Sequence, residues 1–158
     1  MKKEPVILDH IGLLVEDRDK MVDFFKHMPF CKKEWKLEEC DFKQENLRVG
    51  KGYRIKTAFG YLGDLGVEII EPIPEYSEGC YMLEWIGKHG PGFHHVAYHY
   101  EDVELYQKKV EELTEAGMII VLEGETLSQE GTPDEVRVLV HYFADPVTDS
   151  VLEINCFL

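Results

Sequence analysis

The chain repeats its own pattern at a fixed distance of 85 residues, and this repeat restricts the folds open to it. Set at that offset, His10 meets His95, and the Val67-Glu68-Ile69 segment meets Leu152-Glu153-Ile154. One offset that fits two separate segments without a gap indicates an internal duplication. Each copy begins with a strand that carries a histidine and ends with a strand that carries a glutamate.

Each copy is expected to fold as a strand, a helix and three further strands. Apolar and aromatic residues between turn-forming glycines and prolines predict strands at 6–15, 32–42, 53–62 and 66–71, and again at 94–100, 118–123, 136–143 and 150–157. Helical spacing follows Asp17 and Asp102, which are expected N-caps, and ends before Pro29 and at Gly117. A short helix is expected at 81–88, and a polar loop at 124–134.

Length and composition indicate one soluble domain of the α+β class. A chain of 158 residues can build one substantial core, so residues 1–158 are expected to form a single domain with module one at 5–72, a linker at 73–91 and module two at 92–158. Only three apolar residues lie between Pro5 and Asp9, too few for a signal peptide, and no run of about 18 apolar residues predicts a membrane helix. We therefore expect a cytoplasmic protein whose four cysteines are reduced thiols.

The charge balance excludes one class of partner. Asp and Glu number 31 against 17 Lys and Arg, which gives a formal net charge of −14, and the lysines form no stripe. Nucleic acid and anionic membranes both require positive charge on the protein, so neither is expected as a partner. A small-molecule substrate is expected instead. An anionic substrate remains compatible with the negative net charge, because a local cluster of basic residues in a pocket can bind it.

Strand alternation predicts a metal site between the two copies. His10 shares its strand face with Gly12, and His95 shares its face with Ala97, so small neighbours leave space beside each imidazole. Two histidines and two carboxylates at equivalent positions of a twofold-repeated sheet would converge on its axis. Such a set suits a divalent ion of Zn, Co, Ni, Mn or Fe, with open positions for water or substrate. The expected ligands are His10, Glu68, His95 and Glu153.

Alternation also sorts the neighbouring candidates. Glu71 is the rival of Glu68, but it lies on the opposite strand face and is expected to face solvent or to cap the turn at Pro72. His94 is expected to point away from His95 and to be structural. His99 shares the face of His95, and it is either a neighbour only or a residue that orients a ligand.

Four motifs resemble the vicinal oxygen chelate superfamily, which includes glyoxalase I, methylmalonyl-CoA epimerase, extradiol dioxygenases and bleomycin-resistance proteins. The motifs are Asp9-His10-Ile11-Gly12, Val67-Glu68-Ile69-Ile70-Glu71-Pro72, Gly90-Pro91-Gly92-Phe93-His94-His95-Val96-Ala97 and Val151-Leu152-Glu153-Ile154. The epimerase pattern is the most similar, through Glu71-Pro72, Lys88-His89-Gly90 and the His94-His95 pair. The resemblance implies two βαβββ modules that curl around the ion and the same four ligands. It also implies Glu153 as the residue that removes a proton, an acyl-CoA or a thiol adduct as substrate, and a homodimer.

One departure from the epimerase pattern concerns the second proton-transfer group. Epimerases carry an acidic residue in the middle strands of the first module, whereas residues 46–63 contain no carboxylate. Arg54 or Lys56, in this stretch, is either solvated or a partner for an anionic substrate group. Three functional classes follow: a metal-dependent isomerase or lyase that acts through an enolate, an extradiol-type Fe(II) dioxygenase, or a protein that binds a small molecule without catalysis. The filled ligand set favours the first.

Overall fold

In the described part of the chain, nine strands form one sheet whose order is nearly symmetric about the two histidine strands. The computed structural model describes residues 6–158, so the expected start of module one at Pro5 lies outside the described residues. The strands are β1 (Val6–Leu14), β2 (Lys36–Phe42), β3 (Leu47–Val49), β4 (Tyr53–Leu62), β5 (Leu65–Pro72), β6 (Gly92–Tyr100), β7 (Ile119–Ser128), β8 (Val136–Ala144) and β9 (Val151–Phe157). Their order in the sheet is β2-β4-β5-β1-β6-β9-β8-β7-β3. This confirms the predicted α+β class with a curled mixed sheet.

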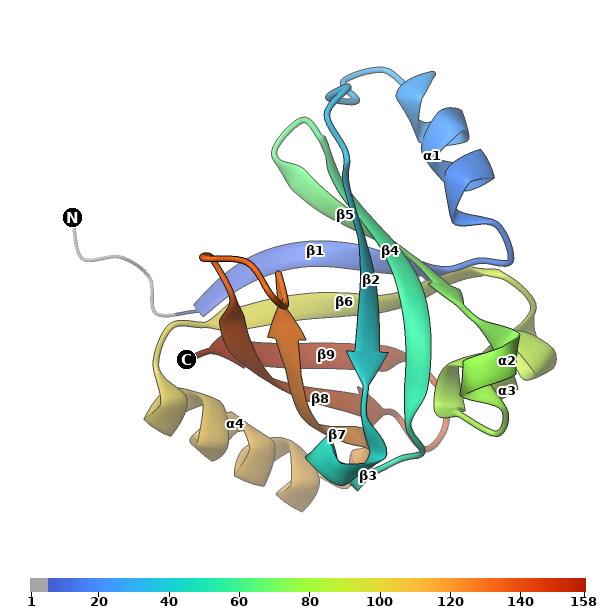
Figure 1. Ribbon diagram of the computed structural model, residues 1–158. Coiled ribbons are helices and arrows are strands. Elements are labelled where there is room, and N and C mark those ends of the chain that lie inside the picture. The colour runs from blue at the N-terminus through green and yellow to red at the C-terminus, as the bar shows by residue number, and fades with distance from the viewer. Residues whose placement is uncertain (1–5) are drawn as a thin grey trace.

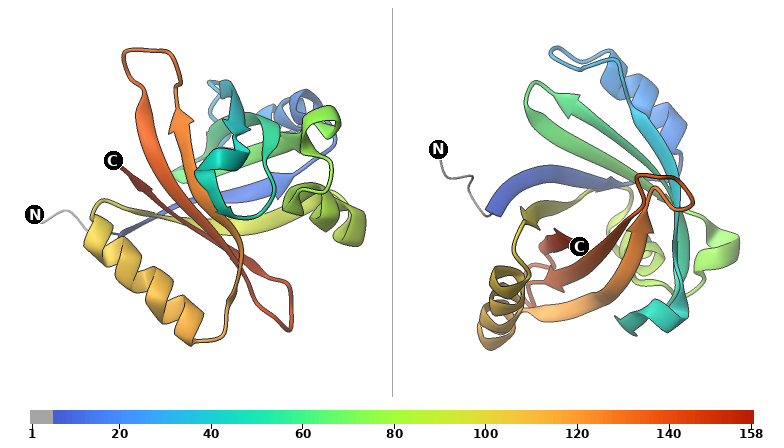
Figure 2. Two further views of the ribbon diagram at one scale, coloured as in Figure 1. Left: turned by 60° about the horizontal axis from the view of Figure 1, so that its bottom comes forward. Right: turned by 60° about the vertical axis from the view of Figure 1, so that its left-hand side comes forward.

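The two copies meet along β1 and β6. These strands pair antiparallel, while β1 pairs parallel with β5 and β6 pairs parallel with β9. The four strands expected to carry the histidines and glutamates are therefore adjacent at the centre of the sheet. The sheet is curled in both views of Figure 2, and side chains from all four strands meet on one face of it.

Two helices cover the outer face of the sheet, and the helix at Tyr81–His89 packs against the core inside the curl. They are α1 (Arg18–Lys26), α2 (Pro74–Ser77), α3 (Tyr81–His89) and α4 (Val103–Glu115), and α1 and α4 lie outside the curl in Figure 1. Both predicted N-caps are confirmed, because the side chains of Asp17 and Asp102 accept hydrogen bonds from the backbone of Lys20 and Leu105. Phe25 of α1 packs against the outer side of β5, and Tyr106 of α4 packs against that of β9.

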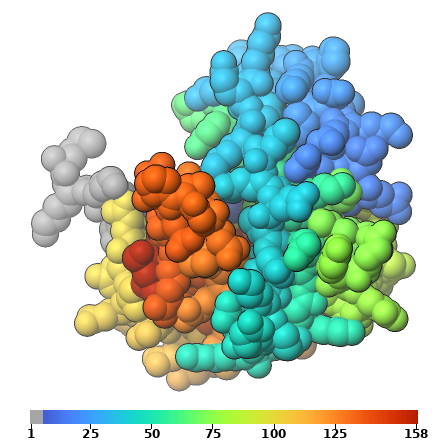
Figure 3. All heavy atoms as spheres, in the orientation of Figure 1, coloured from blue at the N-terminus to red at the C-terminus, as the bar shows by residue number. Residues whose placement is uncertain are grey.

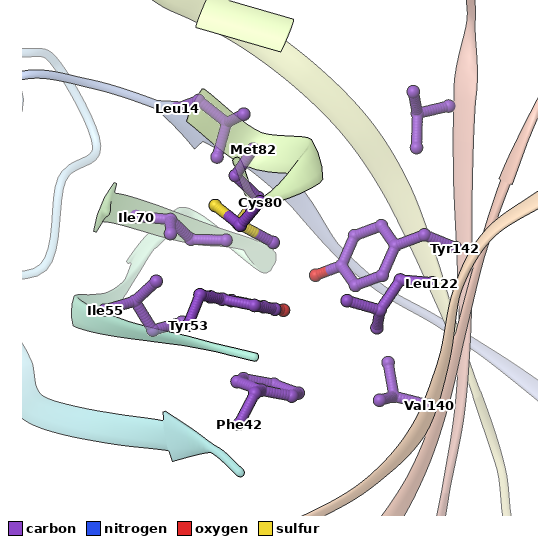
Figure 4. Close-up of a cluster of buried hydrophobic side chains, with 11 residues drawn as sticks. Leu14, Phe42, Tyr53, Ile55, Ile70, Cys80, Met82, Leu122, Val140 and Tyr142 are labelled. Atoms are coloured by element: carbon purple, nitrogen blue, oxygen red, sulfur yellow. The ribbon is translucent and has the colours of Figure 1, made fainter. Parts of the chain in front are cut away.

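The interior of the curl contains an apolar core beside an open cavity. Tyr53 of β4 and Tyr142 of β8 come from opposite walls, and their hydroxyl groups point toward each other in Figure 4. The short strand β3 leaves the first copy and pairs with β7 of the second, which draws the two edges of the sheet together. The concave face is thus enclosed on several sides, and beside the core that α3 helps to fill it leaves space for a site.

Three local features differ from the sequence prediction. Strand β7 continues to Ser128 and pairs with β8 over residues expected to be a loop, because main-chain hydrogen bonds with β8 outweigh the polar side chains of this segment. Strand β3 and helix α2 were not predicted, since both are too short to leave a periodic pattern. Among residues 6–158, no helix is long and apolar enough to cross a membrane.

Candidate metal centre

The structure brings His10, Glu68, His95 and Glu153 together at the centre of the curl. One potential ligand atom from each residue lies within 4.8 Å of those of the other three. His10 Nε2 lies 3.3 Å from His95 Nε2 and 3.2 Å from Glu68 Oε2, and His95 Nε2 lies 3.1 Å from Glu153 Oε2. The side chains come from β1, β5, β6 and β9, one from each central strand.

These separations suit a single divalent ion. Nitrogen and oxygen ligands about 2.0–2.2 Å from one ion lie roughly 3 to 4.4 Å from one another. Glu153 Oε2 is buried, and within the described residues it lies 3.1 Å from His95 Nε2 and 3.7 Å from His10 Nε2 without a well-aligned hydrogen bond to either. A buried carboxylate oxygen without a hydrogen bond is costly, and an ion between the four groups would bind it directly. The residues therefore fit a divalent metal by distance, by donor type and by this unsatisfied oxygen.

Gly12 makes room for the imidazole of His95. The two residues lie opposite each other on β1 and β6. A Cβ atom at Gly12 would lie 1.9 Å from His95 Cε1 and 2.2 Å from Nε2, which no pair of non-bonded atoms tolerates. The equivalent position on β6 is Ala97, which lies opposite His10. The sequence predicts small residues beside the two imidazoles, and the structure shows that the ring of His95 fits only because position 12 is glycine.

A bulge beside each histidine supplies that histidine with a partner. The pairing of β1 with β6 skips Asp9 on one strand and His94 on the other, so both residues depart from simple alternation. Asp9 and His94 are equivalent in the two copies. Asp9 Oδ2 lies 2.6 Å from His10 Nδ1, and His94 Nδ1 lies 2.9 Å from His95 Nδ1. In each case Nε2 remains for the centre, as in carboxylate-histidine-metal sites.

The prediction that His94 points away from His95 is therefore wrong. His94 is buried, and its Nε2 lies 3.2 Å from the hydroxyl oxygen of Tyr81. Burial and the neighbouring His95 lower the pKa of His94 to about 2, so its imidazole stays neutral. A neutral ring with a proton on Nε2 donates to Tyr81 and accepts at Nδ1 from His95. This arrangement fixes the tautomer of His95.

Glu153 is held by a second pair of residues. Asn155 Nδ2 donates to Glu153 Oε1 at 2.9 Å, and His99 Nδ1 lies 2.8 Å from Asn155 Oδ1. His99 thus supports the cluster, as the sequence allowed, but it does so through Asn155 and Glu153 rather than by contact with His95.

A cavity of about 350 Å³ opens beside the cluster, and its wall includes His10, Glu68 and Glu153. Apolar and aromatic side chains form much of the remaining wall, among them Phe42, Ile55, Phe59, Val138, Val140 and Tyr142. The end of the β7–β8 hairpin, in orange, lies beside the blue-to-cyan segment that contains β2 in Figure 3. A small molecule with an apolar body fits such a space.

Glu38 lines the same cavity and was missed by the sequence reasoning. It lies on β2 with Lys36, Cys40 and Phe42, which share its strand face, and Lys36 Nζ lies 3.0 Å from its carboxylate. The sequence signal was the alternation Lys36-Glu38-Cys40-Phe42. The stretch without a carboxylate is 46–63, whereas β2 precedes it and reaches the cavity through the curl of the sheet.

Two cationic candidates for substrate binding lie away from the cavity. The cavity-facing side chains of β4 include Ile55, Thr57 and Phe59, so Arg54 and Lys56 alternate to the other face. There Arg54 is 3.4 Å from Asp41, and Lys56 is 2.9 Å from Glu71. Of the two alternatives for Arg54 and Lys56, their position outside the cavity favours the one without a substrate contact. Glu71 also lies outside the cluster, where it accepts a hydrogen bond from the backbone of Arg18.

The cluster is electrostatically paired. Burial alone lowers the pKa of His10 and His95, but close contacts with the surrounding carboxylates outweigh burial, and both pKa values lie above the usual 6.5. Burial likewise acts to raise the pKa of Glu68 and Glu153, yet close contacts with the two histidines leave both below the usual 4.5. A divalent ion would take the place of the two imidazole protons without changing the net charge of the group.

A curled mixed sheet of paired βαβββ units is the architecture of a known protein class. Residues 9–133 match the family model described as the Glyoxalase/Bleomycin resistance protein/Dioxygenase superfamily. The chain belongs to this superfamily. No curated protein matches the sequence significantly.

Solved structures share the fold at low sequence identity. A hypothetical protein from Bacillus halodurans C-125 is 21% identical with a TM-score of 0.60, over 97% of this chain and 95% of that one. Methylmalonyl-CoA epimerase from Mycobacterium tuberculosis is 16% identical with a TM-score of 0.57, over 94% and 86%. A variant of the Streptomyces coelicolor epimerase, in complex with 2-nitronate-propionyl-CoA, is 17% identical with a TM-score of 0.58, over 97% and 95%. At these identities the likeness establishes a shared fold.

Proposed function

We propose that the protein is a divalent-metal-dependent isomerase or lyase that acts on a small molecule through an enolate. The observation that carries the proposal is the four-residue cluster at one wall of a cavity, in which Glu153 Oε2 is buried without a hydrogen bond. The proposed metal ligands are His10, Glu68, His95 and Glu153. A bound ion would supply Lewis acidity to the carbonyl oxygen of the substrate and stabilise the enolate charge.

The residues around the cavity divide the remaining work. Glu153 is the proposed proton acceptor, because its Oε2 is directed at the cluster while Asn155 occupies its other oxygen. Glu38 reaches the cavity from β2 and is the proposed second proton-transfer group, a role for which the sequence alone offered no residue. The apolar walls would hold the body of the substrate and reduce the access of water to the enolate.

The proposed substrate is an acyl-CoA or a thiol adduct, and methylmalonyl-CoA is the first compound to test. The epimerases with this fold support that choice, since one was solved with an acyl-CoA analogue. We further propose a cytoplasmic homodimer. The four free cysteines agree with a reducing compartment.

Solvent deuterium exchange tests the reaction. The metal-loaded protein would be incubated with methylmalonyl-CoA in deuterium oxide, and incorporation at the carbon between the two carbonyl groups followed by NMR. Exchange by the native protein and by Glu71→Ala, with loss in Glu153→Ala, is the expected result. Absence of exchange in the native protein would reject methylmalonyl-CoA epimerase. Equal exchange in the native protein and Glu153→Ala would reject Glu153 as the acceptor.

A further inference from the structure

The four residues of the cluster are not held equally. Asp9 contacts Nδ1 of His10, His94 contacts Nδ1 of His95, and Asn155 donates to Oε1 of Glu153. Each of these three residues has an outer partner that leaves one atom free for the centre. Glu68 differs. Within residues 6–158, no hydrogen bond or ion pair joins its carboxylate to a residue other than His10 and His95.

The duplication makes this difference informative. The residues equivalent to Asn155 and His99 in the first copy are Ile70 and Leu14, which are apolar core residues. The first copy therefore lacks the amide and the imidazole that hold the glutamate of the second copy. Strands β5 and β9 have equivalent places in the sheet, but only β9 carries a side chain that holds its glutamate by a hydrogen bond.

The Asn155 amide is fixed in the orientation that supports Glu153. His99 Nδ1 donates to Asn155 Oδ1 at 2.8 Å, which directs Nδ2 toward Glu153. The reverse amide orientation would place oxygen against oxygen and lose the bond to Glu153. His99 also packs edge to face on Phe157, with ring centres 4.6 Å apart. Glu153 is thereby restrained by a chain of contacts that extends to the end of β9.

Exposure points in the same direction. The Glu68 side chain is 21% exposed, against 8% for Glu153, 5% for His10 and 0% for His95. Glu68 lines the cavity, where an incoming molecule would reach it. Its withdrawal from the centre would break no outer hydrogen bond in the described structure, whereas withdrawal of Glu153 would break the bond from Asn155.

We propose that Glu68 is the exchangeable ligand of the centre, displaced when a chelating substrate binds, while His10, His95 and Glu153 remain in place. This inference rests on the proposed metal centre. Asn155 and His99 are positioning residues that make Glu153 the permanent carboxylate. The enzyme thus gains positions for two substrate oxygens without losing the carboxylate proposed to accept the proton.

Cobalt binding tests the inference without any substrate. The affinity of the metal-free full-length protein for Co²⁺ would be measured by competition with a chromophoric chelator, and the visible absorption of the bound ion recorded. Glu68→Ala is expected to weaken binding by less than about tenfold and Glu153→Ala by more than about 100-fold. Asn155→Leu and His99→Leu are expected to weaken it by about 10- to 100-fold, the usual cost of losing an outer partner. His99→Asn, whose amide replaces the Nδ1 donor, is expected to restore most of the affinity.

Acetohydroxamate, a small chelator with two oxygen donors, provides a second measurement if a variant folds poorly. Acetohydroxamate is expected to bind Co²⁺-loaded Glu68→Ala more tightly than the Co²⁺-loaded native protein, because in the variant no Glu68 carboxylate has to leave the ion. Thermal unfolding of the metal-free variants separates loss of folding from loss of positioning, and Glu71→Ala serves as the control. No Co²⁺ binding by the native protein would reject the proposed function itself. If the native protein binds Co²⁺ but Glu68→Ala and Glu153→Ala lose affinity equally, the inference is overturned and the proposed function stands. The same holds if neither variant binds acetohydroxamate more tightly than the native protein.

Discussion

Replacement of Gly12 by alanine is expected to disrupt the centre through a residue that contributes no ligand atom. The added Cβ would lie 1.9 Å from His95 Cε1, and ordinary contact begins near 3.4 Å, so the imidazole has to move by about 1.5 Å. The ring has little room, since it is fully buried, its Nδ1 contacts His94, and Tyr142 packs against it with ring centres 5.2 Å apart. Metal–ligand distances tolerate only about 0.2 Å.

The expected result is a loss of metal affinity of at least about 100-fold, with a smaller cost in folding stability of about 1–3 kcal/mol from overpacking. Isothermal titration with Zn²⁺ and thermal unfolding of the metal-free protein measure the two effects separately. The clash disappears when the imidazole is absent. Gly12→Ala is therefore expected to destabilise the native chain but to cost little in a His95→Ala background.

Gly87→Ala is the matched control, because a Cβ at Gly87 in α3 meets no atom within 4 Å. It is expected to leave metal affinity unchanged and to stabilise the helix by about 0.5–1 kcal/mol. Native-like affinity in Gly12→Ala would refute the reasoning. So would an equal loss of stability from Gly12→Ala with and without the His95 side chain, since the effect would then not arise from the contact between them.

Three further results are expected. Glu38→Gln keeps native metal content but slows proton exchange at the substrate carbon by about 100-fold, as loss of a general acid or base does, and an unchanged exchange rate measured by NMR would remove Glu38 from the mechanism. Metal affinity falls as the pH is lowered, and the fall begins above pH 6.5 because the carboxylates raise the pKa of His10 and His95. The folding stability of the metal-free protein shows the opposite trend, because the protonated histidines stabilise the fold and this contribution is lost as the pH rises through their raised pKa values. A melting temperature in EDTA that rises from pH 6 to 9 would contradict the assignment. Lys56→Ala leaves metal affinity and exchange unchanged, because Lys56 pairs with Glu71 outside the cavity, and a raised KM would show instead that it meets the substrate.

The repeat in the sequence was sufficient to predict the central strands and the four residues that meet there. Strand pairing and duplication place His10, His95, Glu68 and Glu153 at equivalent positions, and a shared offset is a long-range signal that survives without an alignment. Gly12 was visible in the sequence as a small neighbour of His10, but the space that it leaves for His95 depends on the pairing of β1 with β6.

The neighbours of the ligands were harder to predict, because they depend on departures from regular strands. A bulge changes the face of one residue and leaves no mark in a pattern of alternating side chains, so Asp9 and His94 could not be placed. Glu38 required knowledge of how far the sheet curls, which the distant β3–β7 pairing helps to set. Asn155 was predictable in part, since it lies two residues after Glu153 on the same strand face.

The central claim is that the two copies together bind one divalent ion, and metal content tests it most directly. The native protein, loaded with Zn²⁺ or Co²⁺ and freed of excess ion, is expected to retain one ion per chain by elemental analysis. His95→Ala and Glu153→Ala are expected to retain far less, and Glu71→Ala, altered outside the cluster, is expected to match the native protein. No ion in the native protein, or undiminished content in both cluster variants, would contradict the account.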